Sequence, residues 1–167
     1  MTFPFLHVLA LAVSEGDLRA VRDLVGRSLA RGARTLEMGC GPGLFADLFV
    51  EGDYVGVDPR PRLVDYARRE RAGAFICDEL RSVGLPDARF DQAVALDLFG
   101  PRSESLGRAI TAEVKRLIAP GGRMLLVERA ESGERVGRLV SSIGRTVRRE
   151  GLRSGFRERV AFHVSLS

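Results

Sequence analysis

The sequence alternates short apolar runs with segments of helical periodicity. The apolar runs occupy residues 34–38, 54–57, 74–77, 93–98 and 124–127. Between them, residues 44–50, 61–70 and 103–118 carry apolar side chains at helical spacing. Strands that alternate with helices form parallel sheets with right-handed crossovers. The pattern therefore predicts an α/β fold with a doubly wound, mostly parallel sheet of six to seven strands and helices on both faces.

At 167 residues the chain has the length of one domain, 1–167, and we divide that domain into three parts. A first apolar helix over residues 3–13 and a second helix that ends at Gly32 are expected to cover the site as an N-terminal part, 1–32. Residues 33–130 form the core. Residues 131–167 form a C-terminal helix and an edge strand.

The C-terminal part begins with helical spacing and ends with alternation. Apolar side chains at Val136, Val140 and Val147 predict a helix over residues 134–150. Apolar and polar side chains then alternate over residues 156–166, which predicts an antiparallel strand with one buried face. Too little chain remains for a complete partner strand, so we expect a bare sheet edge that offers a contact for a homo-oligomer.

Composition excludes several classes of protein. Two cysteines cannot form a disulfide scaffold, and two histidines at opposite ends, His7 and His163, exclude a histidine-rich metal centre, so no metal is expected. No apolar run reaches the roughly 20 residues of a membrane span. The apolar N-terminus lacks the basic residues of a signal peptide, so we expect a cytoplasmic protein. The net charge of +4 arises entirely from residues 131–167.

Carboxylates stand at the ends of the expected strands. The acids are Glu37, Asp58, Asp78, Asp97 and Glu128. In a parallel sheet the carboxyl ends of the strands lie at one edge, which is where such sheets bind ligands. Taken singly, Asp97 or Glu128 is explained equally well as a turn residue or a helix cap. The whole series, spaced by about one strand–helix unit, favours a shared binding site.

A glycine-rich loop, Glu37-Met-Gly-Cys-Gly-Pro-Gly43, follows the first expected strand. Glycine allows the backbone to turn tightly and to approach a ligand closely. A nicotinamide dinucleotide site requires G-x-G-x-x-G and places a pyrophosphate at the helix start. Here Leu44 replaces the third glycine of that pattern, and Glu37 would repel a pyrophosphate. The loop therefore disfavours an NAD-dependent oxidoreductase.

Five segments together resemble the class I S-adenosylmethionine-dependent methyltransferases. Glu37–Gly43 is similar to the E/D-x-G-x-G-x-G loop of that family, and Gly56–Pro59 to its ribose-binding segment. Cys77–Leu80 is similar to its adenine-binding segment. Leu85–Asp91 resembles the approach to the fourth strand, and Leu117–Gly122 the L-x-P-G-G turn before the fifth. The resemblance implies a Rossmann-like fold and methyl transfer from S-adenosylmethionine, with S-adenosylhomocysteine as the product.

The resemblance also implies which residues hold the cofactor. Asp58 would accept hydrogen bonds from the ribose hydroxyls, and Asp78 would accept one from the adenine amino group. Acidic residues suit a cofactor that carries a sulfonium and an ammonium cation but no phosphate. The implied cofactor-binding residues are Glu37, Gly39, Cys40, Gly41, Gly43, Asp58, Pro59, Cys77, Asp78, Glu79 and Asp97. We expect Cys40 and Cys77 to be buried and inert.

Two residues are candidates for a catalytic role. Asp97 follows the fourth strand and could act as a base, bind an amine substrate or contact the methionine end of the cofactor. Phe99 would line the pocket or belong to the core. His7 is the other candidate base, although a lone histidine in an apolar helix is more often a packing or surface residue. The segment lacks the Asn/Asp-Pro-Pro-Tyr/Phe motif that the family uses on amino groups of bases and amides.

The sequence leaves the methyl acceptor open. We expect an O, N or C nucleophile of a small-molecule metabolite. An RNA or protein acceptor is the alternative, because Arg138, Arg145 and Arg149 form a stripe on the expected C-terminal helix. A solvated outer face is the more common explanation of such a stripe. A third alternative is a cofactor-binding subunit that does not catalyse methyl transfer.

Overall fold

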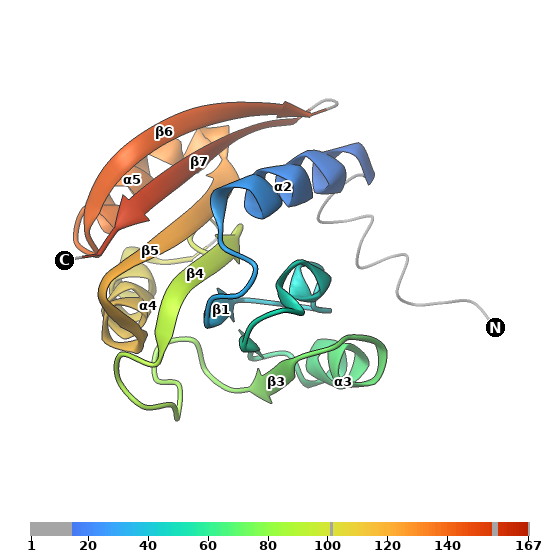
Figure 1. Ribbon diagram of the computed structural model, residues 1–167. Coiled ribbons are helices and arrows are strands. Elements are labelled where there is room, and N and C mark those ends of the chain that lie inside the picture. The colour runs from blue at the N-terminus through green and yellow to red at the C-terminus, as the bar shows by residue number, and fades with distance from the viewer. Residues whose placement is uncertain (1–14, 101, 155–156, 167) are drawn as a thin grey trace.

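The computed structural model describes residues 15–100, 102–154 and 157–166 and contains a seven-stranded sheet of order β3-β2-β1-β4-β5-β7-β6 (Figure 1). The strands are β1 (Thr35–Met38), β2 (Tyr54–Asp58), β3 (Ala74–Cys77), β4 (Phe90–Leu96), β5 (Ile118–Arg129), β6 (Arg145–Ser154) and β7 (Arg157–Ser165). The first five strands are parallel, and β7 and β6 pair antiparallel to their neighbours. The predicted doubly wound, mostly parallel fold is confirmed.

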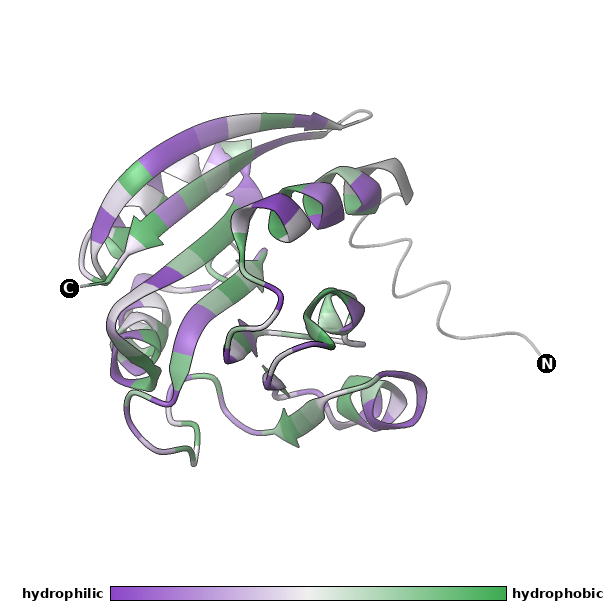
Figure 2. Cartoon of the chain, viewed as in Figure 1, coloured by the Kyte–Doolittle hydropathy of each residue, from purple (hydrophilic) through white to green (hydrophobic). Residues whose placement is uncertain are grey.

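Helices cover both faces of this sheet (Figure 1). They are α2 (Glu15–Ser28), α3 (Pro61–Glu70), α4 (Glu104–Leu117) and α5 (Gly133–Val140), with short 3-10 helices η1 (Ala46–Phe49) and η2 (Ala130–Ser132). Apolar side chains of α4 and α5 form one core with the sheet. Those of α2, η1 and α3 form a second core on the opposite face. Because both faces are covered, the central strands are predominantly apolar, with a hydrophilic stretch in β4 (Figure 2).

The register brings the carboxyl ends of the parallel strands together. Met38 at the end of β1 lies opposite Val57, and Leu96 at the end of β4 lies opposite Val127. Asp58 lies opposite Cys77. The glycine loop, the acids that follow β3 and β4, and Glu128 near the end of β5 therefore lie at one side of the sheet, which we call the carboxyl edge.

The predicted helix over residues 134–150 is wrong in its second half. Helix α5 ends at Val140, and β6 begins at Arg145 and pairs with β7 along its length. Gly144 lies directly before β6, and a Cβ atom there would lie 2.2 Å from the Ser165 carbonyl oxygen. Only glycine permits this approach, and the strand pairing that it allows overrides the helical spacing of the valines. The seventh strand is therefore complete.

Two other boundaries differ from the expectation. The helix expected over residues 44–50 is a single 3-10 turn, η1, whose Phe49 is buried against the sheet. Strand β5 begins at Ile118 rather than Met124, and its register against β4 shifts across the Pro-Gly-Gly segment, where Gly121 has φ of 79°. The expected helix over residues 3–13 lies outside the described residues, so the predicted cover over the site stays a prediction.

Candidate active site at the carboxyl edge

The glycine loop turns sharply because three of its residues adopt positive φ. The φ angles of Gly39, Gly41 and Gly43 are 76°, 52° and 71°. The loop is tied to β2, since the amides of Gly39 and Cys40 both donate to the Val57 carbonyl, at 2.8 and 3.1 Å. A Cβ at Gly43 would lie 2.8 Å from the Phe75 ring. The glycine spacing is thus a requirement of the backbone and of close packing.

Cys40 fixes the loop against the next strand. Its side chain is buried, as predicted. A Cβ atom at Gly56 would lie 2.8 Å from the Cys40 Sγ, so the loop packs directly on the backbone of β2. Burial raises the pKa of the Cys40 thiol, and the neighbouring carboxylates raise it further. A thiol of this kind is a packing group rather than a nucleophile. Cys77, in contrast, is exposed, so the prediction that both cysteines are buried is wrong for Cys77.

Asp58 ends β2 with a fully hydrogen-bonded carboxylate. It accepts from the Gly41 amide at 2.9 Å, from the Arg60 amide at 2.9 Å, and from Nε and Nη2 of Arg60 at 2.8 Å each. Burial alone would raise the pKa of Asp58, but the hydrogen bonds from Arg60 and the backbone outweigh it and lower the pKa. Asp58 is therefore an ionised group whose two oxygens are both occupied by Arg60, and its predicted contact with a ribose stays a prediction. The Arg60 side chain is 60% exposed, whereas that of Asp58 is 1% exposed.

Glu37 is buried at the end of β1 and accepts a hydrogen bond from the Tyr54 hydroxyl. Burial raises the pKa of Glu37 to about 8; the Tyr54 hydrogen bond opposes this shift, and nearby Asp58 adds to it. At neutral pH Glu37 is thus mostly protonated here. A bound ammonium group would favour the ionised form.

The segment after β3 is shaped by its own acid. Asp78 accepts from the Glu79 amide at 2.8 Å and the Gly84 amide at 3.1 Å, and these bonds close a turn. Glu79 is exposed, and Pro59 is half-buried on the neighbouring turn. The structure thus brings Asp58, Pro59 and Asp78 to adjacent strand ends, as predicted. Their contacts to a cofactor stay predictions.

Asp97 follows β4 in an unusual backbone conformation and forms a partly buried ion pair. Its φ is 50°, a backbone conformation that residues other than glycine rarely adopt. Its Oδ1 accepts from Nη1 of Arg159 at 2.8 Å. The Arg159 side chain, from β7, is completely buried, whereas that of Asp97 is 24% exposed. The ion pair is compatible with each role that the sequence left open for Asp97.

The loop after β4 is held from two sides. Glu128 accepts from the Phe99 amide at 2.7 Å and the Gly100 amide at 3.0 Å. Arg135 of α5 donates to the carbonyls of Phe99, Gly100 and Arg102. Burial raises the pKa of Glu128 to about 7, against the opposing effect of the Phe99 amide. Glu128 and Arg135 thus position the loop, and Phe99 is buried in the core.

A small cavity of about 200 Å³ opens beside this loop. It is lined by Asp97, Gly100, Glu128, Arg129, Glu131 and Ser132. Within the described residues no group of three or more histidine, cysteine or acidic side chains is arranged to hold a metal ion. None of the described helices combines the length and apolar character needed to cross a membrane.

Sequence reasoning missed three arginines of the site, Arg60, Arg135 and Arg159. No pattern in the sequence separates them from the other arginines, because each reaches its partner through a long side chain. The other candidate base, His7, lies outside the described residues. Among the predicted residues, Glu37 and Asp58 are near neighbours, and so are Asp97 and Glu128, since Asp58 raises the pKa of Glu37 and Asp97 raises that of Glu128.

Solved structures share this architecture. A SAM-dependent methyltransferase from Aquifex aeolicus superposes with a TM-score of 0.79 at 18% identity, over 99% of this chain and 100% of that one. Magnesium protoporphyrin IX methyltransferase from Synechocystis PCC 6803, solved with bound SAM, gives a TM-score of 0.72 at 16% identity, over 90% of this chain and 78% of that one. At these identities the likeness concerns the fold.

Curated relatives match part of the sequence. The tRNA (carboxymethyluridine(34)-5-O)-methyltransferase ALKBH8 of Macaca fascicularis is 30% identical over 101 residues, and its Xenopus tropicalis counterpart is 30% identical over 100. These matches cover 60% and 59% of this chain but only 15% and 16% of the relatives' own length.

A family model described as "Methyltransferase domain" matches residues 35–122, which is more than half of the chain. The matched region contains the glycine loop, the strand-end acids of β2 to β4 and the Pro-Gly-Gly segment near the start of β5. The predicted resemblance to the S-adenosylmethionine-dependent methyltransferases is thereby confirmed. The same holds for the predicted methyltransferase class, the S-adenosylmethionine cofactor and the Rossmann-like fold. The chain belongs to the methyltransferase domain family, whose members of this fold use S-adenosylmethionine.

Proposed function

We propose that the domain transfers a methyl group to an O, N or C nucleophile of a small molecule. The observation that carries this proposal is the small cavity lined by Asp97 and Glu128 at the carboxyl edge. The loop beside it is held rigidly by Glu128 and Arg135. A rigid loop beside a confined space suits the positioning of a small acceptor, and positioning is a large part of catalysis when the leaving group is already activated.

The residues of the edge fit the cofactor. When bound, S-adenosylmethionine supplies a methyl group on a positively charged sulfur. Asp58 is ionised and buried, so it suits the two ribose hydroxyls once Arg60 withdraws. Asp78 keeps lone pairs for the adenine amino group beyond the two amide bonds that it accepts. Glu37 would release its proton to become the partner of the ammonium group.

We propose that Asp97 acts on the acceptor. Its carboxylate is oriented by Arg159 and is still partly accessible beside the small cavity. From there it would bind an acceptor N–H or O–H, or take up the proton that such a group loses when its bond to the methyl carbon forms. An acceptor that carries no proton at its nucleophile would need only the positioning.

Calorimetric titration tests the cofactor site. We expect the purified chain to bind S-adenosylmethionine and S-adenosylhomocysteine and not NAD. The variant Asp58→Asn keeps an acceptor for the Gly41 amide but loses the charge, and it should weaken binding by about 1.5–3 kcal/mol. Asp65→Asn, which changes an exposed acid on α3, is the matched control. Equal affinity of Asp58→Asn and the unmodified chain would refute the ribose role.

An RNA acceptor is the second candidate, and one structural observation favours it. Strand β6, at the outer edge of the sheet, carries four exposed arginines; they are Arg145, Arg148, Arg149 and Arg153. Two of these were predicted on a helix face and lie instead on this strand. The curated relatives are named as tRNA methyltransferases. Affinity for tRNA that falls steeply between about 50 and 200 mM salt would support this candidate over the small molecule.

A further inference from the structure

The cofactor carries a carboxylate as well as two cations. In the proposed site Asp58, Asp78 and Glu37 suit the ribose hydroxyls, the adenine amino group and the ammonium group. The carboxylate shares a carbon with the ammonium group, and a site lined only with acids would repel it. A cation that is not already neutralised must therefore border the glycine loop if the whole cofactor is to bind.

Arg102 is a half-buried cation in the loop between β4 and α4. Its backbone is fixed on both sides, since its amide donates to the Phe99 carbonyl at 3.2 Å and its carbonyl accepts from Arg135 at 2.8 Å. Its Nη1 donates to the Leu98 carbonyl oxygen, and among the described residues it forms no ion pair with a carboxylate. The loop therefore holds a positive charge that is hydrogen-bonded to a neutral carbonyl rather than to an acid.

Packing places this charge beside the glycine loop. A Cβ atom at Gly39 would lie 3.5 Å from Cδ1 of Leu98, the residue whose carbonyl Arg102 contacts. The next glycine of the loop has the other arginine beside it, since a Cβ atom at Gly41 would lie 3.6 Å from Nη2 of Arg60. Two arginines therefore border the loop that the cofactor is expected to approach.

The other charges of the carboxyl edge act on Arg102. Burial lowers the pKa of Arg102, and nearby Glu128 opposes this shift. Arg60 lowers the pKa further, whereas Asp58 raises it. Arg102 is therefore close enough to the predicted ribose position for the charges there to change its pKa. Because Arg60 and Arg102 repel each other, both would stabilise an anion placed between them.

Arg102 suits a carboxylate ligand better than Arg60 does. Arg60 already forms two hydrogen bonds to the buried carboxylate of Asp58, at 2.8 Å each. Arg102 would exchange a hydrogen bond to a neutral carbonyl for one to a charged group, which is the stronger of the two. The guanidinium group of Arg102 can therefore bind an anion without breaking an ion pair.

We propose that Arg102 binds the carboxylate of the methionine part of S-adenosylmethionine and makes the site specific for ligands that carry this group. The inference rests on the proposed function and adds a specificity-determining residue to its cofactor site. The loop that Glu128 and Arg135 hold beside the small cavity would then position the cofactor as well as the acceptor.

Calorimetric titration of the full chain with three ligands tests the inference. The first ligand is S-adenosylhomocysteine. The second is its decarboxylated analogue, S-adenosyl-3-thiopropylamine, which keeps the amine but lacks the carboxylate. The third is 5′-methylthioadenosine, which lacks both groups. We expect the unmodified chain to bind S-adenosylhomocysteine about tenfold more tightly than the decarboxylated analogue, or better.

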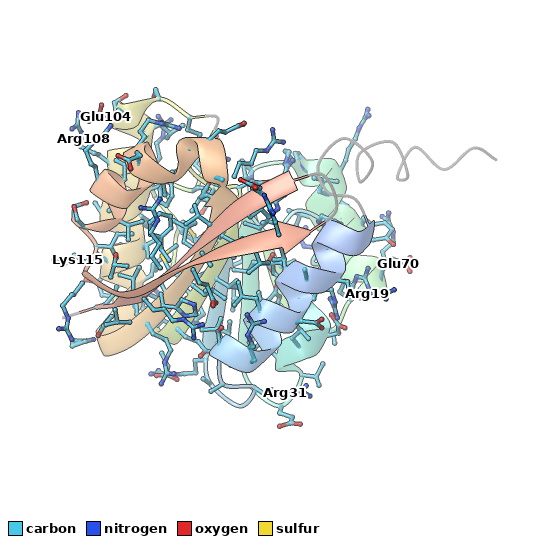
Figure 3. The ribbon with its side chains drawn as sticks, turned by 90° about the horizontal axis from the view of Figure 1, so that it is seen from above. Arg19, Arg31, Glu70, Glu104, Arg108 and Lys115 are labelled. Atoms are coloured by element: carbon cyan, nitrogen blue, oxygen red, sulfur yellow. The ribbon has the colours of Figure 1, made fainter. Side chains whose placement is uncertain are left out.

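Variants of the arginine separate recognition from folding. Arg102→Met removes the charge at similar length and should weaken binding of S-adenosylhomocysteine by about tenfold, while binding of the other two ligands changes less than about twofold. Arg102→Lys keeps a charge and should lose less affinity. The matched control is Arg108→Met, which changes an exposed arginine of α4 that pairs with Glu104 (Figure 3) and should change none of the three affinities.

The outcomes are distinguishable. If Arg102→Met binds S-adenosylhomocysteine as tightly as the unmodified chain does, the inference is overturned and the proposed function stands. Equal weakening of all three ligands also overturns it, because Arg102 would then support the loop rather than contact the carboxylate. A loss of S-adenosylhomocysteine alone in Arg60→Ala, and not in Arg102→Met, would assign the carboxylate to Arg60. If the unmodified chain does not bind S-adenosylhomocysteine, the proposed function fails, and the inference fails with it.

Discussion

At the scale of single residues, Arg60 controls access to Asp58. Its guanidinium group occupies both oxygens of the buried carboxylate, yet its own side chain is 60% exposed, so a displaced Arg60 would be solvated. We predict that Arg60→Ala strengthens binding of S-adenosylhomocysteine by about 0.5–1 kcal/mol, which is twofold to fivefold in affinity. Calorimetry measures the change. Arg62→Ala, two residues away and exposed, is the control, and unchanged or weaker binding in Arg60→Ala would show that Arg60 does not compete for the ribose position.

Glu37 links stability to pH. Its pKa is about 8 in the folded chain against 4.5 for a free glutamate, so between these values the folded state holds a proton that the unfolded state lacks. This proton contributes fully to the free energy of unfolding below about pH 4.5, and its contribution is lost as the pH rises to 8. The free energy of unfolding falls by up to about 1.4 kcal/mol per pH unit in this range. Glu128, with a pKa of about 7, acts in the same direction.

We therefore predict that the free energy of unfolding of the unmodified chain falls between pH 5.5 and 8, and that it falls less steeply in Glu37→Gln. Urea denaturation at three pH values measures both slopes. Glu70→Gln, which changes an exposed acid at the end of α3 (Figure 3), should keep the slope of the unmodified chain. Parallel curves for Glu37→Gln and the unmodified chain would mean that Glu37 is already ionised at pH 5.5.

At this scale the sequence located the acids and glycines but not the arginines. The glycine loop and Asp58 follow from spacing because backbone conformation and strand ends determine their positions. Arg60, Arg135 and Arg159 act through the far ends of long side chains. In a chain whose 26 basic residues include 25 arginines, spacing cannot indicate which of them is buried.

At the scale of elements, the loop between β4 and α4 depends on side chains from β5 and α5. Arg135 satisfies three carbonyls of this loop, and these hydrogen bonds to a charged group are worth about 1.5–3 kcal/mol each when buried. We predict that Arg135→Ala lowers the free energy of unfolding by about 1–3 kcal/mol, since the group is only partly buried. We also expect it to speed hydrogen exchange of the Phe99 and Gly100 amides.

The matched control for this loop is Arg138→Ala, on the same helix but exposed. It should leave both the stability and the exchange rates unchanged. If Arg135→Ala destabilised the protein without faster exchange at Phe99 and Gly100, Arg135 would support α5 rather than the loop. Mass spectrometry of peptides that contain residues 98–102 gives the comparison.

The sequence predicts the central strands and helices correctly, but it predicts the C-terminal helix and strands only in part. Strands β1 to β4 are short apolar runs between turn residues, so composition identifies them. Residues 134–150 satisfy a helical spacing in sequence, but the approach of Gly144 to Ser165 depends on a contact between distant segments. The antiparallel pairing of β6 with β7 decides the structure there, and local periodicity carries no information about it.

At the scale of the whole molecule, the sheet ends in an outer strand, β6, that has no neighbour among the described residues on its far side. An open strand edge can pair with a second copy of the chain. Two features oppose such pairing here. The register shifts between Thr146 and Arg148, which disturbs the edge, and the arginines of β6 would repel those of a second β6.

We expect a homo-oligomer to form through β6 only when dissolved salt screens the repulsion between the arginines of the two copies. The Debye length falls from about 10 Å at 0.1 M salt to about 3 Å at 1 M, so sedimentation velocity should detect monomers at the lower salt and dimers at the higher. Val147, which is 55% exposed on β6, should contribute to the dimer, and Val147→Lys should abolish it. Val50→Lys, at a residue 63% exposed far from β6, should not. Dimers at 0.1 M salt, or dimers that survive Val147→Lys, would place the contact elsewhere on the molecule.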